Sequence, residues 1–154
     1  MINHLTDDDA RTLLNNGRIG RLACIIDDYP YVVPVHYLVD GDHIYSHSLS
    51  GRKITALRAN PHACFQVDKV DDECHWHSVI AYGTYEEIVD PDRRGRVLQR
   101  LFERFPTLTP VESQLASDAD PSNIIVISIR IEKLSAVAEG KTRDQFQDSS
   151  QPVW

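Results

Sequence analysis

The sequence is short of cysteine, and its few cysteines are poorly placed for cross-linking or metal binding. Cys24, Cys64 and Cys74 are odd in number, lie far apart and form no C-x-x-C pair. Disulfide-stabilised domains and zinc ribbons need paired cysteines at short spacings, so this pattern argues against both. We expect all three side chains to be reduced thiols.

Positive charge is also scarce. The chain has 16 Lys and Arg residues against 23 Asp and Glu residues, and its net charge is -7. Such a chain has no broad positive field to attract a polyanion, so nucleic acid is not expected as a partner. Any phosphate group has to be recognised locally.

Long apolar runs are missing as well. The segment from Met1 to Asp9 lacks the basic start and apolar core of a signal peptide. No later stretch is long enough to span a bilayer. The sequence therefore predicts a cytoplasmic protein with no membrane contact.

The apolar content is nevertheless sufficient for one globular core, with 42% hydrophobic and 25% charged residues in a chain of 154. Domains commonly contain about 100–150 residues, so we predict a single domain over residues 1–138. The segment 139–154 is polar and aperiodic. We expect it to form a loose tail unless Phe146 or Trp154 docks onto a partner subunit.

Three segments carry helix signals. Thr6 and the three aspartates after it are typical of a helix N-terminus and predict a helix to about Asn16. A second short helix is predicted between Ser50-Gly51 and Asn60-Pro61. Asp90-Pro91 starts a third helix. Its apolar residues recur at helical spacing and are expected in the core or at a dimer contact: Val97, Leu98, Leu101, Phe102 and Phe105.

Runs of β-branched and aromatic residues predict strands. Asp40-Gly41 marks a type I′ hairpin turn, because both central residues of that turn need positive φ. Pro34 lacks an N–H and belongs at a sheet edge or a bulge, where a barrel can open toward a ligand. The element order predicts a mainly β fold with a few helices, an antiparallel barrel with helices at its ends and edges. The strands are expected at Ile19–Ile26, Tyr31–Val39, His43–His47, Ala63–Val70, Val79–Val89 and Ile124–Ile131.

The segment from His47 to Lys53 joins a predicted strand to a predicted helix and suits a phosphate group. Arg52 and Lys53, the Ser48 hydroxyl and the N–H groups of the helix start can together neutralise and orient a phosphate monoester. Gly51 lets the backbone approach the ligand closely. A solvated helix start with two surface cations would give the same pattern.

Histidines and Trp76 are the other candidates for chemistry. His36 and His47 could contact a cofactor or substrate, although a strand histidine is often a half-buried packing residue. His75 and His77 could share a strand face, but no further ligands stand at supporting spacing, so no metal site is predicted. Trp76 fits packing as well as a ligand contact.

Taken in order, several motifs resemble those of one family. They are Pro30-x-Val32-Val33-Pro34-Val35-x-Tyr37, Asp40-Gly41-Asp42-x-Ile44-Tyr45-x-His47-Ser48, Gly51-Arg52-Lys53-Ile54-x-x-Leu57, Asn60-Pro61-x-x-Cys64-Phe65 and Trp76-x-Ser78-Val79-x-x-x-Gly83. This series is similar to that of the pyridoxamine 5′-phosphate oxidase-like superfamily of FMN-binding split barrels. Within it, the series most resembles the nitroimidazole-resistance branch. The likeness is close from Gly17 to Val89 and looser elsewhere.

The resemblance implies a split barrel that forms a homodimer with flavin mononucleotide (FMN) at the subunit interface. A dimer would also cover the apolar strand face from Ile125 to Ile131. By this likeness, Arg52 and Lys53 hold the phosphate, Val33 to His36 follow the isoalloxazine edge, and Tyr45 to His47 pass near the ribityl chain. We call residues 47–53 the phosphate cradle. The cofactor contacts that the resemblance implies, together with Ser48 of this cradle, are Val33, Pro34, Val35, His36, Tyr45, His47, Ser48, Arg52, Lys53, Trp76 and Ser78.

One departure from the family bears on activity. Members that oxidise pyridoxamine phosphate carry basic residues in the strands that match Val32 to His36 and Ser78 to Ile80, and a substrate-binding motif near the C-terminus. This chain has neither. Oxidation of vitamin B6 is therefore not expected.

The leading functional hypothesis is a flavoprotein oxidoreductase, in which FMN passes electrons from a reduced nicotinamide donor to a small nitroaromatic or quinone-like acceptor. The sequence does not identify a general acid or base, and His47 is the candidate catalytic residue. Two alternatives stay open. The protein could bind flavin without catalysis, or it could bind haem on the same barrel with His36, His47 or His77 as axial ligand.

Overall fold

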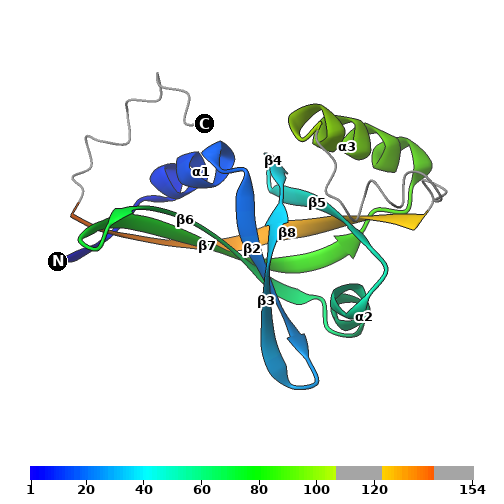
Figure 1. Cartoon of the computed structure of the whole chain (residues 1–154), viewed down its shortest axis with the longest axis horizontal. Coiled ribbons are helices and arrows are strands. Elements are labelled where there is room, and N and C mark those ends of the chain that lie inside the picture. The colour runs from blue at the N-terminus through cyan, green and yellow to red at the C-terminus, as the bar shows by residue number, and fades with distance from the viewer. Residues whose placement is uncertain (107–122, 141–154) are drawn as a thin grey trace.

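Antiparallel strands make up most of the structure, a computed structural model that describes residues 1–106 and 123–140 (Figure 1). These residues form one eight-stranded sheet and three helices. In chain order the elements are β1 (Ile2–His4), α1 (Asp7–Asn16), β2 (Ile19–Ile26), β3 (Tyr29–His36), β4 (Leu38–Asp40), β5 (His43–Leu49), α2 (Arg52–Ala59), β6 (His62–Asp72), β7 (His75–Glu87), α3 (Pro91–Arg104) and β8 (Ile124–Glu139).

The sheet curls into a barrel because its two ends are joined through a single residue. The strand order is β3-β2-β6-β7-β8-β5-β4, with β1 added to β8, and every pair is antiparallel. The first and last strands of this order, β3 and β4, follow each other in the chain with only Tyr37 between them. The Ser46 hydroxyl donates to the His36 carbonyl at 2.7 Å and ties β5 to β3 across the gap. The predicted antiparallel split barrel is confirmed.

Helices α1 and α3 begin at the capping residues that the sequence indicated. The Thr6 hydroxyl accepts from the Asp9 N–H at 3.2 Å, and the Asp9 carboxylate accepts from the Thr6 N–H at 3.3 Å, which completes a capping box for α1. The Asp90 carboxylate accepts from the Arg93 N–H at 2.9 Å at the start of α3. The apolar stripe of α3 forms a second buried cluster with Tyr45 and Val126.

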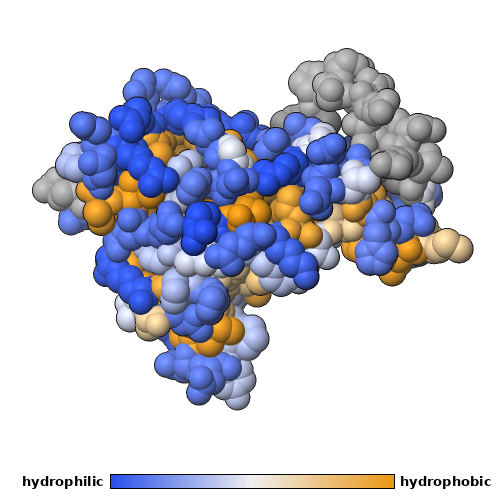
Figure 2. Space-filling model, turned by 180° about the vertical axis from the view of Figure 1, so that it is seen from behind, coloured by the Kyte–Doolittle hydropathy of each residue, from blue (hydrophilic) through white to orange (hydrophobic). Residues whose placement is uncertain are grey.

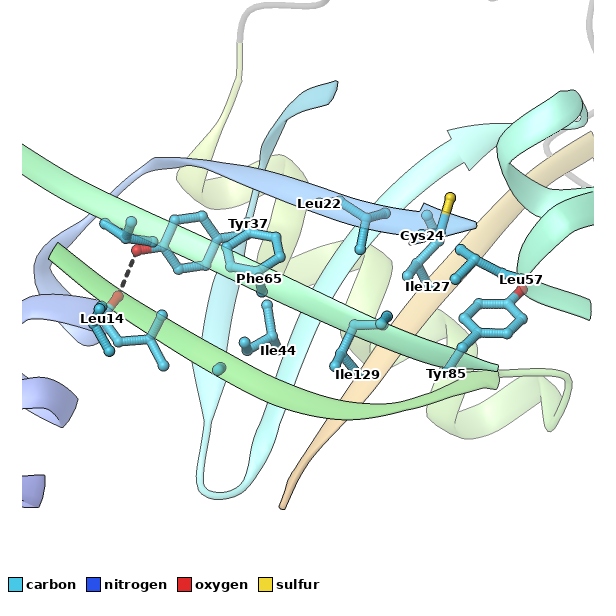
Figure 3. Close-up of a cluster of buried hydrophobic side chains, with 14 of the residues drawn as sticks. Leu14, Leu22, Cys24, Tyr37, Ile44, Leu57, Phe65, Tyr85, Ile127 and Ile129 are labelled. Atoms are coloured by element: carbon cyan, nitrogen blue, oxygen red, sulfur yellow. Dashed lines mark hydrogen bonds between the residues drawn. The ribbon is translucent and has the colours of Figure 1, made fainter. Parts of the chain in front are cut away.

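The main core fills the barrel from α1 to α2 (Figure 3). Tyr37 is fully buried, its hydroxyl donates to the Leu14 carbonyl at 2.5 Å, and its ring meets Phe65 edge-on at 4.8 Å. In Figure 3 Leu14 and Tyr37 lie at one end of the cluster, and Cys24 and Leu57 lie at the other, beside α2. The core thus connects the junction that closes the barrel with α2, the helix at which the phosphate site is predicted.

Close packing of Gly20 against Phe65 gives a prediction about stability. A Cβ at Gly20 would lie 2.1 Å from Cε1 of the buried Phe65 ring. Gly20→Ala should therefore destabilise the fold by about 1–3 kcal/mol, or roughly 2–4 °C in Tm for each kcal/mol. Gly95→Ala is the matched control, since a Cβ there meets nothing within 4 Å in α3. It should stabilise by about 0.4–1 kcal/mol. Thermal unfolding checks both, and an equal Tm in the two variants would contradict this packing.

The last strand is longer than the sequence predicted. β8 continues past Ile131 to Glu139, where small residues replace the isoleucines on the buried face, among them Ala136 and Ala138. Alanine is depleted in strands, so this half of β8 carries a weak strand signal. Glu139, the first residue of the predicted tail at 139–154, is the last residue of this strand. Phe146 and Trp154 lie outside the described residues.

The apolar face predicted for a dimer contact is covered within the chain. Ile127 and Ile129 are buried, and Ile125 and Ile131 pack against the same core. This prediction was wrong because the barrel closes over that face of β8. Exposed apolar residues lie elsewhere, above all on β2 and β3.

The turn between β4 and β5 also differs from the prediction. Asp40 pairs with His43, so the central residues of that turn are Gly41 and Asp42, and of these only Gly41 has positive φ, at 58°. The type I′ pattern occurs instead between β2 and β3, where both central residues have positive φ: Asp27 at 50° and Asp28 at 65°. Aspartate tolerates this conformation better than most residues, so this turn can form without glycine. The β2–β3 hairpin projects from the barrel (Figure 1).

In the part of the chain that the structure describes, the helices are too short or too polar to cross a membrane.

Candidate functional site

The start of α2 has several features that favour an anion. Gly51 precedes the helix, and no side chain caps its first turn. The first N–H groups of a helix have no partner within the helix, and the helix dipole makes this end positive. A Cβ at Gly51 would meet no atom within 4 Å, so the space beside the helix start is open. These features suit a phosphate group.

The two cations at this point differ in exposure. The Arg52 side chain is 79% exposed, and its Nη2 lies 3.9 Å from Oδ2 of Asp27, which is itself highly exposed. Solvent screens an ion pair of this kind, so its contribution is small and Arg52 stays available to a ligand. Asp27 belongs to the turn of the β2–β3 hairpin, which brings this hairpin beside α2.

Lys53 is half-buried and points toward β2. Burial lowers the pKa of Lys53, and the nearby Cys24 thiol raises it by a smaller amount. Burial likewise raises the pKa of Cys24, with an opposing effect of Lys53. Within residues 1–106 and 123–140, no carboxylate is among the charges that act on Lys53. A partly buried ammonium group without a counter-ion is unfavourable by itself, and an anion at the helix start would supply that counter-ion.

This environment predicts that Lys53→Met stabilises the ligand-free protein at pH 7. The pKa of Lys53 is lower in the folded protein than in the unfolded chain, so the unfolded chain binds more protons between the two pKa values. The wild type should gain stability as pH rises through that window, below the ordinary lysine pKa of about 10.4. The gain from Lys53→Met should be roughly 1 kcal/mol or less after solvent screening and should shrink toward pH 10. Thermal melts at both pH values test this, and a less stable variant at pH 7 would contradict it.

The residues of β3 that were predicted to contact the flavin ring lie on both faces of the strand. Val33 and Val35 pack against the core, whereas Pro34 and His36 lie on the outer face. The His36 ring lies 4.6 Å from the ring of Phe105. Among the described strands β3 pairs only with β2, so its second edge, apart from the His36 carbonyl that accepts from Ser46, can offer backbone groups to a planar ligand. A ring along β3 would therefore touch Val33 and Val35 mainly through their backbone.

Two of the predicted cofactor contacts on β5, Tyr45 and His47, face α3. Tyr45 is buried, and its hydroxyl accepts from Nη2 of Arg93 at 2.9 Å. The His47 ring meets Phe102 edge-on at 5.6 Å. The Ser48 hydroxyl donates to the Leu49 carbonyl at 2.9 Å. Tyr45 and His47 thus form part of the packing between β5 and α3, a contact that the strand pattern alone did not indicate.

Trp76 and Ser78 lie on β7, away from α2 in the same chain. The Trp76 indole N–H donates to Glu139 at 2.9 Å, and the Ser78 hydroxyl accepts from Gln66 at 2.9 Å. Trp76 stands close to the β6–β7 turn, which lies at the opposite end of the molecule from α2 (Figure 1). These two residues can approach a phosphate cradle only if a second subunit presents them.

The structure therefore brings together Arg52, Lys53 and the helix start, whereas Trp76 and Ser78 of the same chain lie away from them. Sequence reasoning missed Cys24 and Asp27, which flank the cradle from the β2–β3 hairpin. Alternation along β2 places Cys24 on its buried face, but only the tertiary fold places that face beside α2.

The histidines of β7 form no metal centre in the described residues, where no group of three or more His, Cys, Asp or Glu is placed to hold an ion. His75 is exposed, and its Nδ1 lies 2.8 Å from Oδ1 of Asp72 across the β6–β7 turn. His77 is buried. The cysteines are free thiols, with Cys24 buried and Cys74 exposed.

Comparisons with known proteins agree with this architecture. Residues 6–138 match the model of the pyridoxamine 5′-phosphate oxidase family. An uncharacterized protein of Rhizobium meliloti (strain 1021) is 33% identical over 84 residues, or 54% of this chain and 56% of the relative. The chain thus aligns with little more than half the length of that curated relative.

Two solved structures are similar over nearly the whole chain. An FAD-binding protein from Mesorhizobium loti is 31% identical, with a TM-score of 0.69, and the match covers 91% of this chain and 99% of that one. A protein assigned to 5-nitroimidazole antibiotic resistance from Bacteroides thetaiotaomicron shares the fold at 18% identity, with a TM-score of 0.71 and coverage of 90% and 87%. The family model covers most of the chain, so the predicted resemblance is confirmed: this chain belongs to the pyridoxamine 5′-phosphate oxidase family.

Proposed function

We propose that this protein binds FMN with the phosphate at the start of α2. The observation that carries this proposal is the half-buried Lys53, which has no carboxylate partner among the described residues and stands beside an uncapped helix start. Arg52 would grip the outer phosphate oxygens, and Lys53 would neutralise the inner ones. The likeness to an FAD-binding protein at 31% identity supports a flavin as the ligand.

The isoalloxazine ring would lie along β3. Pro34 and His36 face outward there, and the second edge of the strand can donate and accept hydrogen bonds through its backbone. Tyr45 and His47 would shape the wall between this site and α3, because their rings already pack against Arg93 and Phe102. We therefore assign His47 to positioning of the ring and keep no separate general acid or base.

A homodimer would complete the site. Ile19 and Val32 are 57% and 58% exposed, and with Ile25 they form an apolar surface on the outer face of β2 and β3. Hydrophobic residues are also visible across the middle of the molecule and just above the tip of the projecting hairpin (Figure 2). Exposed apolar residues gathered on one face of a sheet suit a subunit interface. Association through it would let Trp76 and Ser78 of a second copy reach the flavin.

The proposed activity is oxidoreduction. A bound flavin supplies hydride and electron transfer between a reduced nicotinamide and a small acceptor, such as a nitroaromatic or quinone-like compound. The side chains of this chain would bind and orient the flavin and exclude water from one face of its ring. Vitamin B6 oxidation is not proposed, because the strands at Val32–His36 and Ser78–Ile80 lack basic residues.

FAD is a second candidate ligand, favoured by the likeness to the FAD-binding protein from Mesorhizobium loti. Its phosphates could use the same helix start. Acid release of the ligand from purified protein, followed by chromatography against FMN and FAD standards, identifies which one is bound.

Absorption spectroscopy of the purified protein tests the proposal itself. We expect the two visible bands of an oxidised flavin, bleached by NADH or NADPH. A Soret band would instead establish the haem alternative, and a stable flavin spectrum without bleaching would support a non-catalytic flavin-binding protein.

A further inference from the structure

Two arginines connect the end of α3 to the start of β2, at the end of the barrel that faces away from α2. Arg18 precedes β2, and its Nη2 donates to the Arg104 carbonyl at 2.8 Å. Arg104 ends α3, and its Nη2 donates to the Gly17 carbonyl at 2.7 Å. Both guanidinium groups lie over the Phe105 ring, with Cζ at 4.8 Å for Arg18 and 5.7 Å for Arg104. We call Arg18, Arg104, Phe105 and His36 the arginine cluster.

The positive charge of this cluster is not balanced within the described residues. Four other arginines each have a carboxylate within 2.6–2.7 Å: Arg11, Arg21, Arg58 and Arg100. Arg18 and Arg104 have none in residues 1–106 and 123–140, and Nε of Arg104 is buried without a hydrogen-bond partner. Burial and the adjacent Arg18 guanidinium both lower the pKa of Arg104. An anion between the two guanidinium groups would relieve this repulsion.

The position of the cluster relates it to the proposed flavin site. His36 pairs with Ile19 at the start of β2, whereas Lys53 lies near Cys24 further along the same strand. The six residue-to-residue steps from Arg18 to Cys24 correspond to roughly 20 Å of strand. This length is comparable with an extended FMN molecule. A flavin with its phosphate beside Lys53 would therefore place its ring toward the arginine cluster.

We propose that Arg18 and Arg104 bind the carboxylate or phosphate group of the electron acceptor, an inference that rests on the proposed flavin-dependent function. The acceptor is then an anionic compound whose reducible part lies over the flavin ring. The planar guanidinium groups match the paired oxygens of either anion. If the arginines only tie α3 to β2, they have no affinity for anions.

Binding of nitroaromatic probes tests the cluster without dependence on the flavin. The full-length Arg52→Ala/Lys53→Ala protein, whose phosphate cradle is disabled, is titrated with 4-nitrobenzoate, 4-nitrophenyl phosphate and the neutral 4-nitrobenzyl alcohol by isothermal calorimetry. At least one of the two anions should bind more tightly than the alcohol. Whichever anion binds better identifies the acidic group.

Addition of Arg18→Gln to this protein should weaken anion binding roughly 10-fold, as expected for one lost charge-assisted hydrogen bond. Arg18 is exposed, so this change should leave the fold intact. Arg21→Gln is the matched control three residues further along, on β2, because Asp68 already neutralises Arg21, and it should have little effect. Equal affinity for anions and alcohol, or no loss with Arg18→Gln, would overturn the proposal. Failure of FMN to bind the wild type would overturn the proposed function separately.

Discussion

Replacement of Arg52 and Lys53 together by alanine should weaken FMN binding by about two to four decades in Kd. Each substitution removes charge-assisted hydrogen bonds worth roughly 1.5–3 kcal/mol, or about one to two decades in affinity. The fold should survive, because Arg52 is exposed and Lys53 has no carboxylate partner in the described residues. Fluorescence titration of flavin-free protein with FMN measures the effect.

The matched control removes an arginine and a lysine elsewhere. Arg96 and Lys69 are both exposed, on α3 and near the far end of β6. Arg96→Ala/Lys69→Ala changes the net charge of -7 by the same amount and should leave the Kd for FMN within about twofold. Arg93 is unsuitable as a control, because it donates to Tyr45 beside the proposed ring site. An equal loss of affinity in both double variants would show that only overall charge matters.

Val32→Glu should convert the protein from a dimer to a monomer and release most of its flavin. Val32 is more than half exposed in the single chain, so glutamate there should change monomer stability by no more than about 0.5 kcal/mol. In the proposed interface the same carboxylate would be buried without a partner, which typically costs several kcal/mol. Light scattering measures the mass, and the flavin absorbance of the eluted protein measures occupancy.

Val89→Glu is the control for this experiment. Val89 is 76% exposed and lies between β7 and α3, outside the apolar surface of β2 and β3. The Val89→Glu protein should remain a dimer with bound flavin. A wild-type monomer with full flavin occupancy would contradict the proposed shared site, as would a Val32→Glu dimer.

Local signals in the sequence were sufficient for the helices and for most strands. Thr6 and Asp90 cap α1 and α3 as predicted, since capping depends on residues within one turn. The missed features depend on distant contacts. The second half of β8 is stabilised by pairing with β7, although Ala136 and Ala138 have little strand preference of their own. The single-residue junction at Tyr37 likewise reflects barrel closure, which no local pattern encodes.

The sequence predicted only part of the candidate site, because the rest of the site also depends on distant contacts. Arg52 and Lys53 follow Gly51 at a helix start, and one short motif contains the whole cradle. The partial burial of Lys53 could not be predicted, because it depends on how the β2–β3 hairpin packs beside α2. The side-chain directions along β3 and β5 follow simple alternation, but only the position of α3 shows that Tyr45 and His47 face that helix.

Comparison of FMN with riboflavin in a binding titration tests the central claim most directly, because the two ligands differ only in the phosphate. If the phosphate lies at the start of α2, the wild type should bind FMN at least 100-fold more tightly than riboflavin, as expected for two charge-assisted contacts of roughly 1.5–3 kcal/mol each. This preference should fall to within about threefold in the Arg52→Ala/Lys53→Ala protein. Equal affinity of the wild type for FMN and riboflavin would contradict the account, as would a preference that persists in the double variant.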